Sequence, residues 1–154
     1  KVMNSPNEEL DALGEIDSKK LAVIGKEDAD YLKGKTLQAD STAFIELKNY
    51  EANALEFESQ SKTPQLAVFS EIYYPHGWKV SIDGEQVDYI KANYLLRAVY
   101  VPAGKHKINM VFEPEVIETG KTVSLASMGI FILISIAGIG FWYKSRKLKP
   151  TETE

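Results

Sequence analysis

The sequence contains no cysteine and only two histidines, His76 and His106, among its 154 residues. The lack of cysteine excludes thiolate catalysis and cysteine-ligated metal sites, and two histidines are too few for an ordinary structural zinc site. Glycine-rich phosphate loops and metal-ligand spacings are also missing. We therefore expect no catalytic, cofactor-binding or metal-binding residue in this chain.

Charge is missing from one long segment. From Val123 to Tyr143 run 21 residues without a single Asp, Glu, Lys or Arg. At about 1.5 Å per residue, a helix of that length extends about 31 Å and matches the hydrocarbon core of a bilayer. The alternative is a buried helix in a soluble core, but such a helix is rarely apolar on every side. Residues 123–143 are therefore predicted to form a single transmembrane helix in contact with the lipid bilayer.

The charges that flank this span predict its orientation. Basic residues follow it closely, namely Lys144, Arg146, Lys147 and Lys149, whereas the preceding residues 115–122 form an acidic neck. Short segments rich in Lys and Arg stay on the cytoplasmic side. We thus expect residues 1–122 outside the cytoplasm and residues 144–154 inside, as a cytoplasmic basic tail. Export of the first part would require upstream transmembrane helices of the same parent protein.

The net charge is −4, and because the tail is basic, the part before the span is more acidic than the whole. An acidic domain is a poor partner for phosphate backbones. The composition therefore predicts that the chain binds no nucleic acid.

Hydrophobic periodicity divides the outer part into two segments. Residues 1–40 read as a helix and strand segment, with a helix over 4–13 that begins at a capping box of Ser5 and Glu8. Within residues 41–114, the segments 43–47, 55–59, 78–82 and 108–112 alternate with the period of two that is typical of strands. The mostly apolar segment 66–72 reads as a more deeply buried strand, and 87–90 and 94–101 are two further strands. Asp83-Gly84 is a hairpin signal. The fold is thus predicted to be mainly β, an antiparallel β-sandwich followed by one transmembrane α-helix.

Residues 71–114 carry a recognisable pattern. It consists of Tyr-Tyr-Pro-x-Gly-Trp-Lys from Tyr73, Asp83-Gly84, the strand from Asn93 to Arg97, and Val-Pro-Ala-Gly-Lys-His from Val101. This pattern resembles the C-terminal region of the bacterial YfhO-like membrane protein family. The resemblance implies a polytopic protein of the cytoplasmic (inner) membrane, similar to glycosyltransferases of the cell envelope that use lipid-phosphosugars. Its catalytic residues would lie in earlier transmembrane segments, so this chain would be an accessory domain beside a lipid-linked sugar.

A group of polar and aromatic residues within this pattern forms a candidate glycan contact: Tyr73, Tyr74, His76, Trp78 and Arg97. Aromatic rings can stack on sugars, and the planar guanidinium of Arg97 suits phosphates and acidic sugars. Each residue also has a structural interpretation, which we favour. Trp78 begins an alternating strand and would fill the core, and Arg97 would pair with a carboxylate such as Glu71 or Asp83.

Two further alternatives remain open at the level of sequence. The chain could belong to a non-enzymatic envelope protein that binds glycans or proteins, and a self-contained hydrolase is disfavoured by the lack of a defined pair of acids.

Within the predicted span, small and aromatic side chains share one helix face: Ser124, Ser127, Phe131, Ser135, Gly138 and Trp142. Small residues let helices approach closely in a bilayer, so this face is predicted to pack against another helix.

Overall fold

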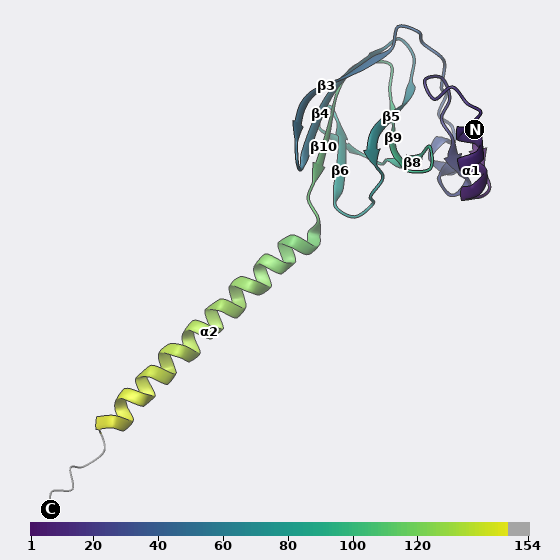
Figure 1. Cartoon of the computed structure of the whole chain (residues 1–154). Coiled ribbons are helices and arrows are strands. Elements are labelled where there is room, and N and C mark those ends of the chain that lie inside the picture. The colour runs from purple at the N-terminus through teal and green to yellow at the C-terminus, as the bar shows by residue number, and fades with distance from the viewer. Residues whose placement is uncertain (148–154) are drawn as a thin grey trace, which may run out of the picture. The chain divides into compact units, whose positions relative to one another are not determined.

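The computed structural model describes residues 1–147, apart from the side chains of residues 115, 118 and 145–147. The chain divides into two compact units, Lys1–Glu113 and Pro114–Glu154. The first contains β1 (Val2–Met3), α1 (Pro6–Leu13), β2 (Ile24–Gly25), the 3-10 helix η1 (Lys26–Leu32), β3 (Phe44–Glu51), β4 (Ala54–Ser61), β5 (Gln65–Ile72), β6 (Trp78–Ile82), β7 (Glu85–Val87), β8 (Ile90–Ala92), β9 (Leu96–Val101) and β10 (Gly104–Phe112). The second contains α2 (Glu115–Lys147). Most of these elements are labelled in Figure 1.

The first unit is built from two antiparallel sheets. One has five strands in the order β3-β4-β10-β6-β7, and the other has three in the order β5-β9-β8. A short parallel pair, β1 and β2, is added by the N-terminal segment. The mainly antiparallel β fold followed by one apolar helix is therefore confirmed.

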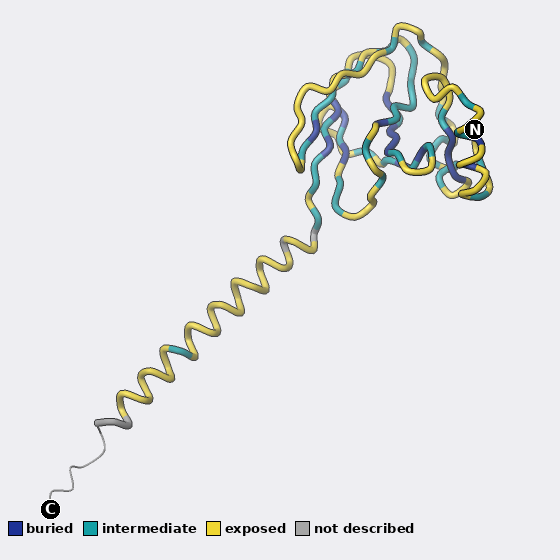
Figure 2. Tube along the Cα trace, in the orientation of Figure 1, coloured by how far each residue is buried: buried dark blue, intermediate teal, exposed yellow. Residues whose placement is uncertain are grey.

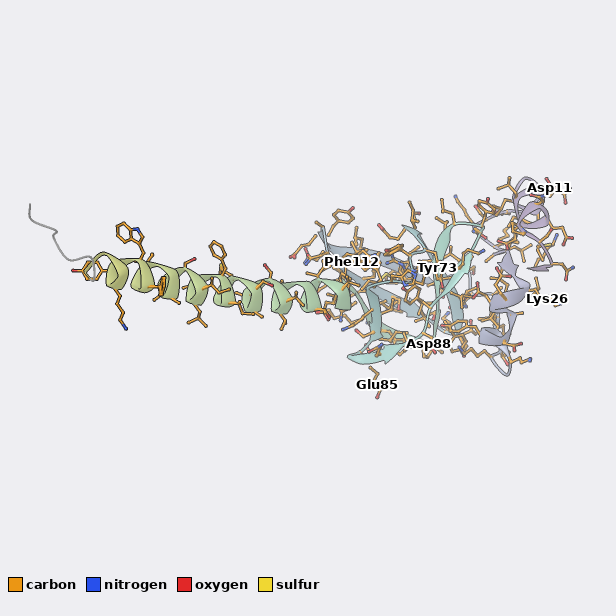
Figure 3. All side chains as sticks on the ribbon, turned by 90° about the horizontal axis from the view of Figure 1, so that it is seen from below. Asp11, Lys26, Tyr73, Glu85, Asp88 and Phe112 are labelled. Atoms are coloured by element: carbon orange, nitrogen blue, oxygen red, sulfur yellow. The ribbon has the colours of Figure 1, made fainter. Side chains whose placement is uncertain are left out.

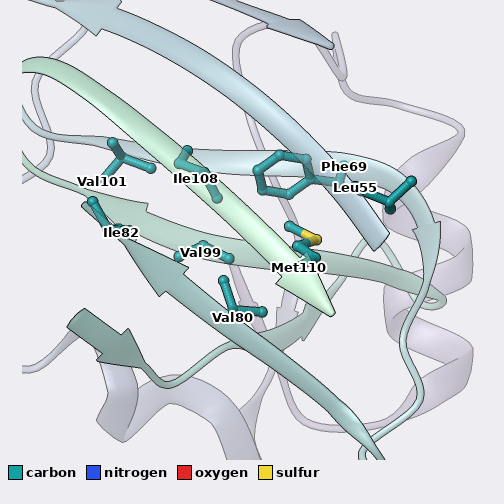
Figure 4. Packing of buried hydrophobic residues seen from close by; sticks show 8 residues of the cluster. All are labelled: Leu55, Phe69, Val80, Ile82, Val99, Val101, Ile108 and Met110. Carbon is teal, nitrogen blue, oxygen red and sulfur yellow. The ribbon is translucent and has the colours of Figure 1, made fainter. Parts of the chain in front are cut away.

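The core lies between the two sheets. Alternate residues of β4, β10 and β6 from one sheet meet those of β5 and β9 from the other, and Figure 4 shows the eight most central: Leu55, Phe69, Val80, Ile82, Val99, Val101, Ile108 and Met110. Three of them, Val99, Ile108 and Met110, are completely buried. The rings of Phe57 and Phe69 pack edge to face across the sheets, with their centroids 4.7 Å apart. The period of two thus places one face of each central strand in the core, as expected for a sandwich.

The N-terminal segment covers the other face of the three-stranded sheet. A second buried cluster joins Ile24 of β2 to Ile90, Ala92 and Ala98 of β8 and β9. Asn93 holds this segment in place: its side-chain Oδ1 accepts from the backbone N–H of Val23 at 2.9 Å, and its own N–H donates to the Val23 carbonyl at 2.7 Å. Asn93 has a φ of 49°, a left-handed conformation that asparagine tolerates well.

One helix start and one hairpin follow the local sequence closely. Ser5 caps α1 by accepting from the Glu8 N–H at 3.3 Å, and Glu8 in turn accepts from the Asn4 N–H at 3.0 Å. Asp83 and Gly84 both have positive φ, as the tight turn between β6 and β7 requires. The predicted strand 94–101 begins later than expected, at Leu96, because Tyr94 with a φ of 68° belongs to the turn.

Strand β3 differs from the sequence expectation. Its alternation over Ile45 and Leu47 suggested one buried face, but every residue of β3 is exposed, as the yellow tube in Figure 2 shows. β3 is the outer strand of the five-stranded sheet and pairs with β4 alone, so its side chains have a neighbouring strand on one side only. Ile45 is 41% exposed to solvent and Leu47 is 47% exposed.

Helix α2 contains the predicted transmembrane segment. Thr119–Lys144 is long and apolar enough to cross a membrane, with a mean hydropathy of 2.2, and none of it is buried within this chain. The expected neck, 115–122, is helical and continuous with the span. The hydroxyls of Ser127 and Ser135 donate to the carbonyls of Val123 and Phe131 at 2.8 Å, which satisfies both hydroxyls inside the helix. Of the predicted tail, residues 148–154 lie outside the described residues.

The central strand β10 provides a test of the sandwich. We expect Ile108→Ala to lower the free energy of unfolding by about 3 kcal/mol, because it removes a fully buried side chain between both sheets. Ile45→Ala in the exposed strand β3 is the matched control and should cost less than about 1 kcal/mol. Urea denaturation of the full chain, followed by far-UV circular dichroism, measures both. Equal losses for the two variants would contradict the observed core.

Candidate functional site

Arg97 lies at the centre of the predicted glycan-contact group. It points from β9 into the sandwich and is only 1% exposed. Its guanidinium carbon lies 4.4 Å from the centre of the Trp78 ring and 5.8 Å from that of Tyr89. Nη2 donates to the Ile72 carbonyl at 3.0 Å and Nη1 contacts Met110 Sδ at 3.2 Å, whereas Nε has no hydrogen-bond partner. Arg97 therefore supports the fold from inside, and its planar group is not presented to a ligand.

The expected carboxylate partners of Arg97 lie elsewhere. Within residues 1–113 its guanidinium forms no salt bridge, and Asp83 is bonded to His106 and the Lys107 backbone instead. Glu71 acts only as a nearby charge. Burial lowers the pKa of Arg97, while Tyr89 and Glu71 oppose that shift by attraction. Arginine nevertheless stays protonated because its ordinary pKa is so high. The aromatic faces of Trp78 and Tyr89 thus take the place that we had assigned to a carboxylate.

Tyr89, which the sequence did not suggest, joins the predicted residues together. Its hydroxyl donates to the Tyr74 carbonyl at 2.9 Å and reaches the Trp78 carbonyl at 3.3 Å. Its ring meets Tyr73 edge to face at 5.6 Å. Desolvation by burial is the main cause of a raised pKa for the Tyr89 hydroxyl, so it acts as a neutral donor. These contacts give Tyr89 a structural role, because they tie it to the loop between β5 and β6.

Tyr74 and His76 lie at the other end of the group, where they are exposed. The Tyr74 ring packs edge to face on His76 at 5.6 Å and lies 6.3 Å from Phe112. Phe112 also contacts Trp78 at 5.3 Å and is labelled with Tyr73 in Figure 3. The five predicted residues are therefore brought into one aromatic neighbourhood. Trp78 is half-buried and lies between the buried Arg97 and the exposed Tyr74 and His76.

The surface of this neighbourhood carries a small hollow. It measures about 210 Å³ and is lined by Tyr73, Pro75, Trp78, Lys79 and Tyr89, among others. Ligand pockets ordinarily begin near 300 Å³, so the hollow suits at most one edge of a sugar ring. Its chemistry is stacking and hydrogen bonding. Within the described residues, no group of three or more His, Asp or Glu side chains is placed to hold a metal ion.

A second polar contact was missed in the sequence. Asp83 Oδ2 lies 2.7 Å from His106 Nδ1, and Asp83 Oδ1 accepts from the Lys107 N–H at 2.8 Å. The hydrogen bond from His106, followed by that from the Lys107 backbone, holds the pKa of Asp83 below its ordinary value. This contact ties the β6–β7 turn to the start of β10. The sequence did contain a signal for this contact. The Asp-Gly turn follows β6 and the Pro-Ala-Gly turn precedes β10, and because these two strands are antiparallel neighbours, both turns lie at the same end of the sheet.

Comparison with known proteins adds the decisive observation. A family model described as the bacterial membrane protein YfhO matches residues 19–124. The chain belongs to the YfhO family. The match includes every strand from β2 to β10 and continues into α2, so the sandwich and the start of the membrane helix are parts of one family unit. Searches of curated proteins and of solved structures gave no match. Together with the apolar helix, the family identifies a membrane protein.

Trp78 tests whether the aromatic neighbourhood is mainly structural in this YfhO-family domain. Trp78→Ala should lower the free energy of unfolding by about 3 kcal/mol, because it opens the sandwich and uncovers the Arg97 guanidinium. Trp78→Phe keeps a ring over the guanidinium and should cost about 1 kcal/mol. Thermal unfolding of the full chain measures both. An unchanged melting temperature combined with lost glycan binding would reverse our interpretation.

Proposed function

We propose that this chain is the extracytoplasmic accessory domain and last transmembrane helix of a YfhO-family protein that resembles lipid-phosphosugar-dependent glycosyltransferases of the bacterial cell envelope. In this proposal the β-sandwich stands outside the cytoplasmic membrane and binds or steers the acceptor glycan. The chemistry is performed by transmembrane segments upstream of the sandwich in the same parent protein. The lipid-linked sugar would approach from the membrane side.

The observation that carries the proposal is the extent of the family match. It runs without interruption from the N-terminal segment through both sheets into α2. A sandwich joined to a membrane helix keeps its binding surfaces close to the bilayer, where lipid-linked substrates are found. The apolar side chains of α2, none buried within this chain, are available to lipid and to neighbouring helices. The stripe of Ser124, Ser127 and Gly138 is the face that we assign to helix packing.

The side chains of the sandwich support a binding role over a catalytic one. Sugar chemistry requires a positioned acid and base, or a carboxylate working with a metal and a phosphate. Of the two histidines, His106 is bonded to Asp83 and His76 packs on Tyr74. The most buried carboxylate, Glu9, lies 4.0 Å from Lys91, which is also bonded to Glu27. The contacts of Glu9 and Glu27 with Lys91 hold the N-terminal segment against β8.

An alternative is a non-enzymatic envelope protein that binds a glycan or a protein. Strand β3 favours it, because its apolar side chains Phe44, Ile45 and Leu47 remain exposed on the free edge of a sheet. Exposed strand edges readily pair with another chain. The sequence of the parent protein upstream of Lys1 would distinguish the two functions. Many hydrophobic spans, with an acidic residue in the first outer loop, would support the enzyme.

The orientation can be tested by reporter fusions in a bacterial host. A reporter that is active only in the cytoplasm should work after Glu154, and one that requires export should work before Lys1, because Lys144 and its basic neighbours stay inside. Replacing the four basic residues after the span with Gln provides the matched control and should weaken this preference. An exported reporter active after Glu154 in the unchanged chain would contradict the proposed topology.

The accessory role predicts that the chain alone has no turnover. The full chain, reconstituted in lipid nanodiscs, should neither transfer sugar from lipid-linked donors nor hydrolyse glycosidase substrates. Membranes that contain the complete parent protein serve as the positive control in the same assay. Turnover that disappears on replacing Glu71, Asp83 or His76 would show that the chain is itself an enzyme.

A further inference from the structure

Four large apolar or aromatic side chains are exposed together at one end of the first unit. Ile72 is the last residue of β5, Tyr74 lies in the loop between β5 and β6, and Tyr94 and Leu95 precede β9. Their exposed fractions are 61%, 48%, 43% and 48%, in that order. The backbone N–H of Tyr73 donates to the Leu95 carbonyl at 2.8 Å, so the two segments are adjacent. We call these four residues the apolar patch.

The chain leaves the first unit beside the apolar patch. Glu113, the last residue of that unit, donates its backbone N–H to the Gly77 carbonyl at 2.6 Å, and Gly77 belongs to the same loop as Tyr74. The ring centres of Tyr74 and Phe112 lie 6.3 Å apart. From Glu113 to Thr119, where the segment able to span a membrane begins, even a fully extended chain covers at most about 22 Å. The headgroup layer adds about 5–7 Å to the hydrocarbon core on each side. The covalent connection alone therefore keeps the patch near the bilayer surface.

The opposite end of the sandwich has the composition of a surface that faces water. It is formed by the turns at 62–64, 83–84 and 102–103, which join β4 to β5, β6 to β7 and β9 to β10. Lys62, Asp83 and Lys105 lie in or next to these turns and are exposed, and in these three described turns no large hydrophobic side chain is exposed. In the loops that connect β3 through β10, the exposed large hydrophobic residues thus lie at the end from which the chain continues into α2.

The chemistry of the patch matches the interface between lipid and water. Tyrosine is enriched there because its ring is apolar and its hydroxyl remains in contact with water. The charged residues next to the loop, Lys79 and Glu113, pair with each other at 3.0 Å. A lipid contact at this patch would therefore depend on buried apolar area, and attraction to anionic headgroups would add little.

We propose that Ile72, Tyr74, Tyr94 and Leu95 enter the headgroup layer of the bilayer and hold the sandwich on the membrane surface. An apolar protein surface could also cover such a patch, but lipid is the partner that α2 already brings within reach. The inference goes beyond the proposed function. It requires the membrane helix alone, and it holds whether or not the sandwich binds a glycan.

The test uses the full chain, one copy per nanodisc of neutral phosphatidylcholine whose acyl chains are brominated near the headgroup. Because the chain has no cysteine, each single-cysteine variant carries an environment-sensitive fluorophore at one site. Leu95→Cys places the label in the apolar patch, and Lys105→Cys places it at the opposite end as the matched control. We expect the brominated lipid to quench the label at 95 and its emission to shift to the blue, and the label at 105 to show neither change.

Added charge in the patch should abolish the contact. Ile72→Asp with Tyr94→Asp, introduced into the Leu95→Cys chain, should remove most of the quenching, because carboxylates resist transfer out of water. Both side chains are exposed, and aspartate tolerates the left-handed conformation of position 94, where φ is 68°. Ile45→Asp with Leu47→Asp on β3 adds the same charge elsewhere and should leave the quenching unchanged. Urea denaturation confirms that both double variants fold.

Several outcomes would overturn the inference. They are an unquenched label at 95, equal quenching at 95 and 105, quenching that requires anionic lipid, and full quenching in the patch variant with two added aspartates. A label at 95 that is shifted to the blue but not quenched would show that protein covers the patch instead of lipid, which also overturns the inference. None of these measurements involves a sugar, so their failure leaves the proposed accessory function to its own tests.

Discussion

Arg97 carries a positive charge into the interior of two sheets that together have only eight strands, and the surrounding structure depends on how that charge is accommodated. No carboxylate reaches it within the sandwich, so its stabilisation comes from the Trp78 and Tyr89 rings and from the Ile72 carbonyl. A buried charge without a partner costs several kcal/mol. The loop between β5 and β6 must therefore keep its aromatic residues in place, and Tyr89 fixes that loop through the Tyr74 and Trp78 carbonyls.

Several residues that carry the family resemblance make contacts that hold the fold together. Trp78 covers Arg97, Asp83 binds the β6–β7 turn to β10, and Asn93 anchors the N-terminal segment through Val23. Each makes a contact between segments that are distant in the sequence. A family pattern concentrated in such residues defines a fold, and the ligand contacts of an individual member can then lie on strand edges and loops outside it.

Sequence reasoning predicted what local chemistry controls. The capping box at Ser5, the tight turn at Asp83-Gly84, the alternating strands and the uncharged span of α2 each follow from the residues within a few positions. Sequence reasoning was wrong where the burial or the partner of a residue depends on the arrangement of strands that are distant in the sequence. Ile45 and Leu47 alternate as a core strand would, but β3 is the outer strand of its sheet and both residues stay exposed. Arg97 was assigned a carboxylate because the sequence does not reveal that Trp78 and Tyr89 flank it. The cleft beside Tyr31 and Tyr100 was missed for the same reason, since its walls come from η1, β6, β7, β9 and β10.

Strand β7 links these observations to binding. It is the outer strand of the five-stranded sheet at the end opposite β3, and its residues Gln86 and Val87, with Asp88, border both the small hollow beside Trp78 and a cleft of about 790 Å³ beside Tyr31. A short strand with exposed Glu85 and Gln86 is poorly suited to pair with another sheet, because charged and brief edges discourage strand addition. The same exposure leaves its polar groups available to a ligand on either side. The two free edges of this sheet therefore differ in chemistry: β3 has eight residues and exposes apolar side chains among its charged ones, whereas β7 has three residues and exposes Glu85 and Gln86.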